Sequence, residues 1–374
     1  MSVLLFILIL SFLVLIHELG HYIAAKRSGV IVEEFGIGYP PKAIKLFTWQ
    51  GTDFTLNWIP FGGFVRMKGE EGPIEGESTE KSTKGGEFYS ANTWQKLLII
   101  LSGPGVNFFF GVIVFAAVFT KTGIPELLTE ARIGQVVADS PAATAELPTG
   151  VTITALLVDD QRIETPTVPS AIEAITSHRG KTITLETTGQ CTAFSCQEII
   201  QTFDVYVRTA EETPENQGAI GIAFEQVVYQ RYPGWEMPAR SIVFGFQQAF
   251  ELSRQIVAAL GGLVTNMFVN RTVPDEIAGP VGIVHQAQSS GLLQDGFITL
   301  ISFAGLLSVN LAVMNVLPIP PLDGGRAFLL GAEYIFGKTR TEKVGYYLNY
   351  GGYVLLLGLI VVITIRDVAR IFGL

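Results

Sequence analysis

Four long apolar stretches set the strongest limit on how this chain can fold. They cover residues 3–25, 97–120, 297–317 and 351–365. About 20 apolar residues form a helix that crosses the hydrocarbon core of a bilayer, and only helices and closed barrels satisfy their backbone polar groups there. The chain is also poor in charge, because only 16% of its residues are charged, against about 25% in soluble domains. The sequence therefore predicts a polytopic α-helical membrane protein with four transmembrane helices.

The composition also argues against other classes of protein. A net charge of −9 does not favour a nucleic-acid partner. Two cysteines are too few for a disulfide-dense scaffold. Cys191 and Cys196 flank a predicted turn and would be able to form a disulfide outside the cytoplasm. The sequence leaves that pairing open.

The first apolar stretch contains an H-E-x-x-H motif, His17-Glu18-Leu19-Gly20-His21. Residues i and i+4 share one face of a helix, so His17 and His21 can bind one Zn²⁺. Zinc lowers the pKa of a bound water, and Glu18 is placed to take the water's proton and pass it to a leaving amine. The alternative is a polar cluster satisfied within a helix bundle, but ionisable residues inside a membrane are functional by default. A signal peptide is disfavoured, because no Lys or Arg precedes the stretch.

A catalytic zinc site needs a third protein ligand. The other histidines, His178 and His285, lie outside the predicted spans. Asp323 is the better candidate, because three prolines end the third span just before it, at a depth similar to that of His21. At about 1.5 Å per residue, the zinc would lie inside the membrane and nearer its cytoplasmic face. The alternative for Asp323 is an exposed side chain in a turn at a helix end.

The distribution of Lys and Arg predicts the orientation of the chain. These residues are concentrated in 26–96 and 326–349, which are therefore expected in the cytoplasm. The N-terminus and residues 121–296 are then expected outside. Residues 241–268 are expected to form an amphipathic helix on the outer face of the membrane. If they crossed it, Gln247, Gln248, Glu251 and Arg254 would lie in mid-membrane.

Two further regions are expected to be globular. Residues 30–67 alternate apolar and polar side chains between Gly and Pro, which predicts β-hairpins beside the membrane. Residues 69–87 read as a polar, Gly-rich cytoplasmic loop. Residues 124–237 contain four strand-like runs and one short helical segment, which indicates a small β-rich module.

Five motifs follow one another along the chain: HELGH at 17–21, PFGGFVRMKGEE at 60–71, SGPGVN at 102–107, GPVGI at 279–283 and NVLPIPPLDGGR at 315–326. Together they resemble the site-2 protease family of zinc intramembrane metalloproteases, over essentially the whole chain. The likeness is closest to bacterial members with a single PDZ domain, which resemble the regulator-of-sigma-E protease.

The resemblance implies roles for particular residues. Asp323 would be the third zinc ligand beside His17 and His21. Asn315, Pro318 and Pro320 would position the substrate. Residues 124–237 would be an inserted, extracytoplasmic PDZ-like α+β domain, in which Gly150-Val151 stands where the family has Gly-Asp, so peptide capture by its groove stays open.

The resemblance also implies an activity and a location. The chain would be a zinc-dependent endopeptidase that works within the lipid bilayer of the bacterial inner membrane. It would cleave the transmembrane segments of single-pass membrane proteins already trimmed by an upstream site-1-type protease, such as anti-sigma factors or signal-peptide remnants. Two other classes of protein are alternatives: a membrane adaptor displaying a PDZ domain would not need Glu18, and a zinc transporter would need several intramembrane ligand sets.

The predicted organisation is therefore a first span with the H-E-x-x-H motif (1–26), a cytoplasmic, membrane-associated β region with a polar loop (27–96), a second span (97–120), the PDZ-like domain (124–237), an extracytoplasmic amphipathic helix region (238–296), a third span with the N-x-x-P-x-P-x-L-D-G motif (297–325), a cytoplasmic loop (326–350), and a fourth span with a tail (351–374).

Overall fold

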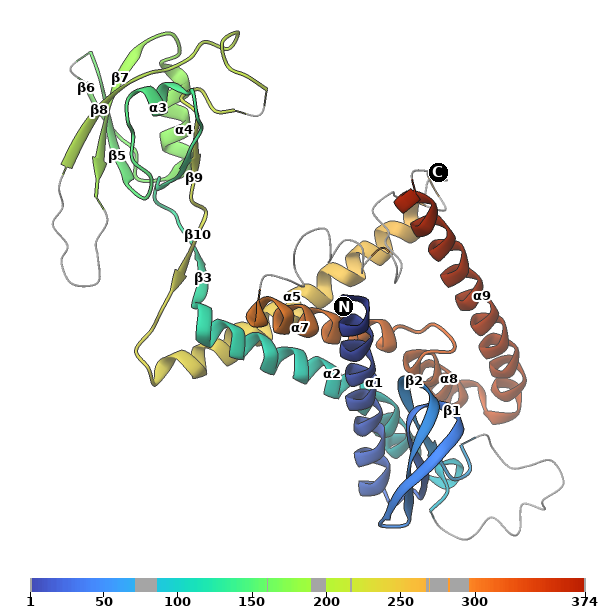
Figure 1. The fold of residues 1–374 in the computed structure, drawn as a ribbon. Helices are drawn as coiled ribbons and strands as arrows, with labels where there is room; N and C mark the ends of the chain where they lie inside the picture. The colour runs from blue at the N-terminus through green and yellow to red at the C-terminus, as the bar shows by residue number, and fades with distance from the viewer. Residues whose placement is uncertain are drawn as a thin grey trace. The chain divides into compact units, whose positions relative to one another are not determined.

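The computed structural model describes residues 2–70, 86–159, 161–189, 200–215, 217–266, 269, 282 and 296–372. The chain forms two compact units (Figure 1), one made of Met1–Lys121 with Gly234–Leu374 and the other of Thr122–Pro233. Cys191, Cys196 and His285 lie outside the described residues, as do most of the polar loop and of the GPVGI motif.

Within the described part of the chain, three helices of the first unit are long and apolar enough to cross a membrane. They are α1 (Ser2–Arg27), α2 (Thr93–Thr122) and α7 (Phe297–Val316). They coincide with the first three predicted spans, so this part of the prediction is confirmed. The fourth predicted span lies within α9 (Lys338–Phe372), and its crossing of the membrane stays a prediction.

Residues 326–350, the predicted cytoplasmic connection between the third and fourth spans, are helical. They belong to α8 (Asp323–Phe336) and to the first part of α9. Their position in the cytoplasm stays a prediction. The two helices are separated by Gly337, which adopts φ 84°, a left-handed conformation that glycine reaches without steric cost.

The helices of the first unit approach one another closely through small residues. A Cβ added at Gly111 on α2 would lie 2.5 Å from Val309 of α7, and one added at Gly305 of α7 would lie 2.7 Å from Val114. The helix α1 also packs on α7, because the ring centroids of Phe6 on α1 and Phe303 on α7 are 6.3 Å apart. Because lipid is as apolar as Leu, such close packing is what holds helices together in a membrane.

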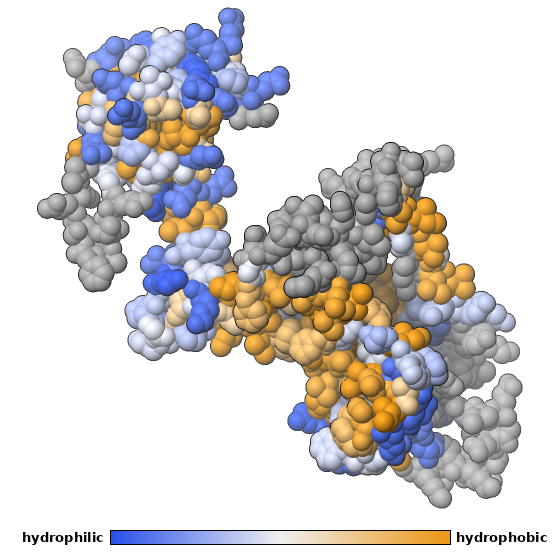
Figure 2. Space-filling model, in the orientation of Figure 1, coloured by the Kyte–Doolittle hydropathy of each residue, from blue (hydrophilic) through white to orange (hydrophobic). Residues whose placement is uncertain are grey.

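A fourth helix, α5 (Glu236–Thr265), packs on α2 and α7 and coincides with the predicted amphipathic segment. Its buried stripe consists of Met237, Ser241, Gly245 and Ala249. The small side chains of the last three allow the helix backbones to approach. The larger apolar residues Val243 and Phe250 are 59% and 61% exposed. Figure 2 shows apolar surface over α2, α5 and α7, which is available to lipid. The position of α5 relative to the membrane stays a prediction.

The β region consists of two long strands, β1 (Val32–Trp49) and β2 (Thr52–Met67), which follow α1. Residues 34–37 of β1 pair with β2 on both sides, with 53–56 on one side and with 63–66 on the other. The folded hairpin therefore has the order 44–49, 52–57, 34–37, 63–67. A short 3-10 helix at Phe88–Ser90 precedes α2.

The second unit is built on a four-stranded antiparallel sheet of order β6-β5-β7-β8. Its apolar core includes Ile153, Leu156, Ile183 and Leu185, each at most 1% exposed. The four strand-like runs of the sequence correspond to β4, β5, β7 and β8, and the short helical segment corresponds to α4. The bounds are β3 (Ile124–Leu127), β4 (Ile133–Val136), α3 (Pro141–Thr144), β5 (Thr152–Val158), β6 (Gln161–Glu164), α4 (Val168–Ser177), β7 (Thr182–Thr188), β8 (Ile200–Tyr206), β9 (Ile222–Phe224) and β10 (Val227–Gln230).

Candidate active site

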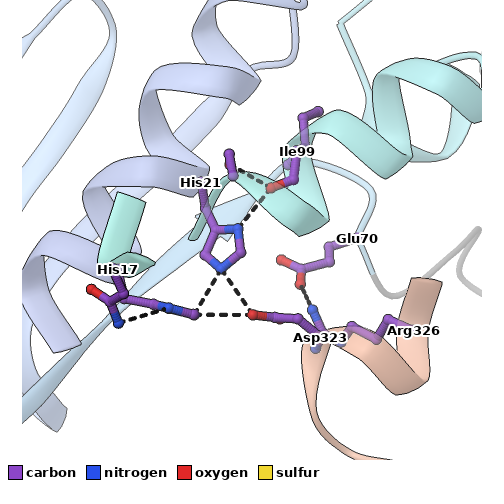
Figure 3. Close-up of polar contacts among 8 residues, drawn as sticks. His17, His21, Glu70, Ile99, Asp323 and Arg326 are labelled. Carbon is purple, nitrogen blue, oxygen red and sulfur yellow. Dashed lines mark hydrogen bonds and ion pairs between the residues drawn. The ribbon is translucent and has the colours of Figure 1, made fainter. Parts of the chain in front are cut away.

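Three side chains from opposite ends of the sequence converge in the first unit. Asp323 Oδ2 lies 3.0 Å from His17 Nε2 and 3.3 Å from His21 Nε2, and the two Nε2 atoms are 3.1 Å apart. Figure 3 shows both imidazoles directed at the Asp323 carboxylate. Tetrahedral zinc with bonds of about 2.0–2.2 Å holds its ligand atoms roughly 3.3 Å apart. These three atoms therefore fit a zinc ion with shifts of a few tenths of an ångström.

Local sequence explains why Asp323 reaches the histidines. The helix α7 ends at Val316, in the Pro-rich segment where proline cannot continue a helix, and α8 begins at Asp323. Two glycines then allow the chain to fold back on itself. A Cβ at Gly324 would lie 2.1 Å from the Val316 carbonyl oxygen, and one at Gly325 would lie 2.7 Å from that of Ile319. A larger residue at either position would push the start of α8 away.

The helix α2 forms the other side of the site. His21 Nδ1 donates to the Ile99 carbonyl over 2.8 Å, which leaves Nε2 directed at Asp323 (Figure 3). Gly103 lies one turn further along α2, where a Cβ would be 2.4 Å from His21 Nε2 and 2.9 Å from His17 Nε2. Asn107, one turn beyond, is fully buried, and its Nδ2 lies 3.4 Å from His17 Nδ1.

His17, His21 and Asp323 form a group that suits a metal ion. Among the described residues, it is the one group of three or more His, Cys, Asp or Glu side chains whose ligand atoms all lie within 4.8 Å of one another.

A cavity of about 400 Å³ opens beside the three side chains. Glu18 and Asn315 both line it, so the proposed base and one of the predicted substrate-positioning residues share it with the metal group. Residues 63–65 of β2 form part of its wall. Pro318 and Pro320 are not among the described residues that line it, whereas Pro321 is.

An ion pair ties the β region to the helix that carries Asp323. Arg326 Nη1, on α8, donates to Glu70 Oε1 over 2.7 Å, just after β2 (Figure 3). Both residues line the cavity. The Arg326 side chain is 51% exposed, so water screens the pair and its contribution to stability is about 1 kcal/mol at most.

Several of these residues were not singled out from the sequence. Gly103 and Asn107 belong to the SGPGVN motif, which supported the resemblance without a role for either residue. A signal was present, because a lone Asn within an apolar span is a polar side chain that needs a partner. The Ile99 carbonyl carries no sequence signal, since every residue has one.

Comparison with known proteins identifies the family of this chain. The family model "Peptidase family M50" matches residues 5–359. A Clostridium perfringens protein provisionally named a zinc metalloprotease is 30% identical, with 97% of each chain covered. The zinc metalloprotease RasP of Oceanobacillus iheyensis is 28% identical, with 99% of each chain covered, and that of Geobacillus kaustophilus is 27% identical, with 99% of this chain and 98% of that protein covered.

The match of the family model over nearly the whole chain includes α1 with its H-E-x-x-H motif, α2, and α7 with the Asp323 segment. The three apolar helices make this a multi-pass membrane protein. The chain therefore belongs to peptidase family M50, the site-2 proteases, and is a zinc metalloprotease.

Proposed function

We propose that this chain cleaves the transmembrane segments of single-pass membrane proteins, with zinc held by His17, His21 and Asp323. The observation that carries the proposal is the convergence of these three ligand atoms within 3.3 Å of one another, beside a cavity that Glu18 also lines. Zinc, when bound, would act as a Lewis acid that lowers the pKa of a water molecule. Glu18 takes the proton from that water and delivers it to the leaving amine.

The substrate must present an extended backbone, because a helix hides its amides in internal hydrogen bonds. Residues 63–67 provide a surface for it: they form an edge of the folded hairpin, and among the described strands their outer side has no partner. This edge lines the cavity through Gly63, Phe64 and Val65. An unwound segment that adds to the edge as a further strand would lie beside the zinc ligands.

Asn315 supports the orientation of that segment, since it lines the same cavity at the end of α7. Pro318 and Pro320 act indirectly in this proposal, by ending α7 and shaping the turn to Asp323. Gly352 of α9 approaches this turn, where an added Cβ would lie 2.2 Å from the Pro320 carbonyl oxygen.

The proposed topology has four spans, with α9 containing the fourth, and with α5 on the outer face. Its support is the shared direction of α1 and α7: Phe6 packs on Phe303 near their starts, and His17 meets Asp323 near their ends. Two helices that run the same way across a membrane need an odd number of spans between them, and α2 is one. A crossing by α5 would reverse α7 and carry Asp323 about 30 Å from the histidines.

The remaining proposals concern the setting of the reaction. The protein lies in the bacterial inner membrane, with the site near the cytoplasmic face and the second unit outside as a PDZ-like domain. Its substrates are proteins already shortened by an upstream site-1-type protease, such as anti-sigma factors or signal-peptide remnants. The PDZ-like domain excludes those whose outer domains are still large. The support for a filtering rather than a catalytic role of the second unit is that every residue of the candidate active site lies in the first unit.

The deciding experiment uses the purified full-length chain and a reporter transmembrane segment. Glu18→Gln should abolish cleavage while one zinc per chain remains by atomic absorption, because Glu18 is a base rather than a ligand. His21→Ala and Asp323→Ala should lose both zinc and cleavage. Cleavage by Glu18→Gln at the parent rate would refute the mechanism. Retention of zinc at full stoichiometry by Asp323→Ala would refute the ligand set.

Two other classes of function predict different outcomes. A membrane adaptor would show no dependence of any activity on Glu18. A zinc transporter would require further ligand sets along a path, and the described residues contain a single group of this kind.

A further inference from the structure

The outer nitrogens of the two histidines have unequal partners. Both Nε2 atoms point at Asp323, so both Nδ1 atoms point away from the proposed metal position. An imidazole that binds a metal through Nε2 carries its proton on Nδ1, and that N–H is usually donated to an oxygen that orients the ring. His21 has such an oxygen, the Ile99 carbonyl at 2.8 Å. For His17, the group at Nδ1 is the Asn107 amide, whose nitrogen lies 3.4 Å away.

The Asn107 amide is itself incompletely satisfied. Its side chain is fully buried on α2, and its Oδ1 is a buried acceptor without a partner among the described residues. With the amide oriented as in the structure, Asn107 Nδ2 donates to His17 Nδ1. The proton of His17 is then on Nε2, which donates to Asp323 Oδ2. That tautomer has no lone pair at Nε2 for a metal.

A half-turn of the amide gives Oδ1 a donor and leaves His17 Nε2 free to bind a metal. It exchanges the positions of Oδ1 and Nδ2, so that Oδ1 faces His17 Nδ1. The ring then carries its one proton on Nδ1 and donates it to Asn107 Oδ1, and Nε2 is left with a lone pair. The number of protons on His17 is the same in both arrangements.

We infer that Asn107 is a positioning residue that holds His17 in the tautomer able to bind zinc through Nε2. This inference rests on the proposed ligand set. Asn107 does for His17 what the Ile99 carbonyl does for His21, from the next-but-one turn of the same helix. The backbone of Asn107 is fixed separately, because Ser308 Oγ of α7 donates to the Asn107 carbonyl over 2.8 Å.

The test compares three variants of the full-length chain by zinc affinity, measured in competition with a chelating dye. Asn107→Leu keeps the size of the side chain but removes the acceptor, and should weaken zinc binding about 10- to 100-fold, as loss of such outer partners does elsewhere. Asn107→Asp keeps an acceptor and should bind zinc within a few-fold of the parent. Ser308→Ala is the matched control, because it loosens α2 from α7 without touching the amide, and should also remain within a few-fold.

A spectroscopic measurement separates tautomer from packing. In zinc-free protein with ¹⁵N-labelled histidine, His17 Nδ1 should be protonated in the parent and in Asn107→Asp, with His17→Ala identifying the signal. If Asn107→Leu does not fold, the parent and Asn107→Asp still decide the question, because an unprotonated His17 Nδ1 in either would overturn the inference.

The outcomes also distinguish this inference from the ligand set beneath it. Parent-like zinc affinity in Asn107→Leu, or an equal loss in Asn107→Leu and Ser308→Ala, would overturn the role of Asn107 alone. Full zinc binding by His17→Ala would instead overturn the ligand set.

Discussion

At the scale of single residues, the site depends on glycines as much as on ligands. His17 and His21 lie against α2 only because Gly103 has no side chain, since a Cβ there would be 2.4 Å from His21 Nε2. Nonbonded heavy atoms do not approach one another this closely, so either α2 or the imidazoles would have to move. Zinc ligands tolerate displacements of only a few tenths of an ångström.

Gly103→Ala should therefore lose zinc affinity by at least tenfold and lose cleavage with it, although it adds one methyl group. Gly105→Ala is the matched control in the same helix, because no atom of the described residues lies within 4 Å of its added Cβ. The control should keep zinc and gain about 0.5–1 kcal/mol in helix stability. Zinc content and reporter cleavage of the two purified variants check this. Equal zinc content in both would contradict the steric argument.

At the scale of elements, α5 packs closely through a stripe of mostly small residues. Its buried residues are Met237, Ser241, Gly245 and Ala249, while Phe250 is 61% exposed. Outside this stripe, Glu251 and Arg254 form a solvent-exposed pair that lowers the pKa of Glu251 to about 2. A carboxylate that stays charged at any physiological pH agrees with a helix at the membrane surface.

We expect Gly245→Ala to loosen α5 from α2. Its Cβ would lie 2.9 Å from both the Ala116 amide nitrogen and the Val112 carbonyl oxygen, and backbone atoms cannot rotate aside. Such overpacking costs about 1–3 kcal/mol. The change should lower the thermal unfolding midpoint in detergent by several degrees without removing zinc. Gly261→Ala is on the same helix, and none of the described residues lies within 4 Å of its added Cβ, so this change should not lower the midpoint. Unfolding at the same temperature in both variants would show that the stripe does not hold the helix.

At the scale of the whole molecule, the first and last strands of the second unit lie side by side. The strands β3 and β10 pair antiparallel, with Ile124 opposite Gln230. A short Gly/Ser linker can therefore replace Thr122–Pro233 without separating α2 from α5.

This replacement should leave cleavage of a short reporter substrate near the parent rate and should admit substrates with large outer domains. The reason is that the candidate catalytic residues all lie in the first unit. Cleavage of a substrate series with outer domains of increasing size provides the measurement. A folded, zinc-loaded variant that cannot cut the short substrate would show that the second unit takes part in the reaction rather than filtering substrates.

The proposed topology makes a separate prediction at the same scale. In a background with Cys191 and Cys196 replaced by Ser, Gln248→Cys on α5 should be labelled by a membrane-impermeant thiol reagent from outside the cell. Tyr334→Cys on α8, a position 83% exposed, should be labelled only after the inner face is opened. Labelling of both from one side would contradict the topology and, with it, the contact of Asp323 with the histidines in the membrane.

The elements of this protein follow from its sequence, because hydropathy and proline act over a few neighbouring residues. The three spans, the shared face of His17 and His21, and the break before Asp323 are properties of that kind. The contact of Asp323 with His17 joins residues 306 positions apart, and depth in the membrane only suggested it. Gly103, Asn107, the open edge at 63–67 and the stripe of α5 emerge only when helices and strands pack. Their roles depend on which surfaces fit together to within an ångström, and a pattern of neighbours along the chain carries no such information.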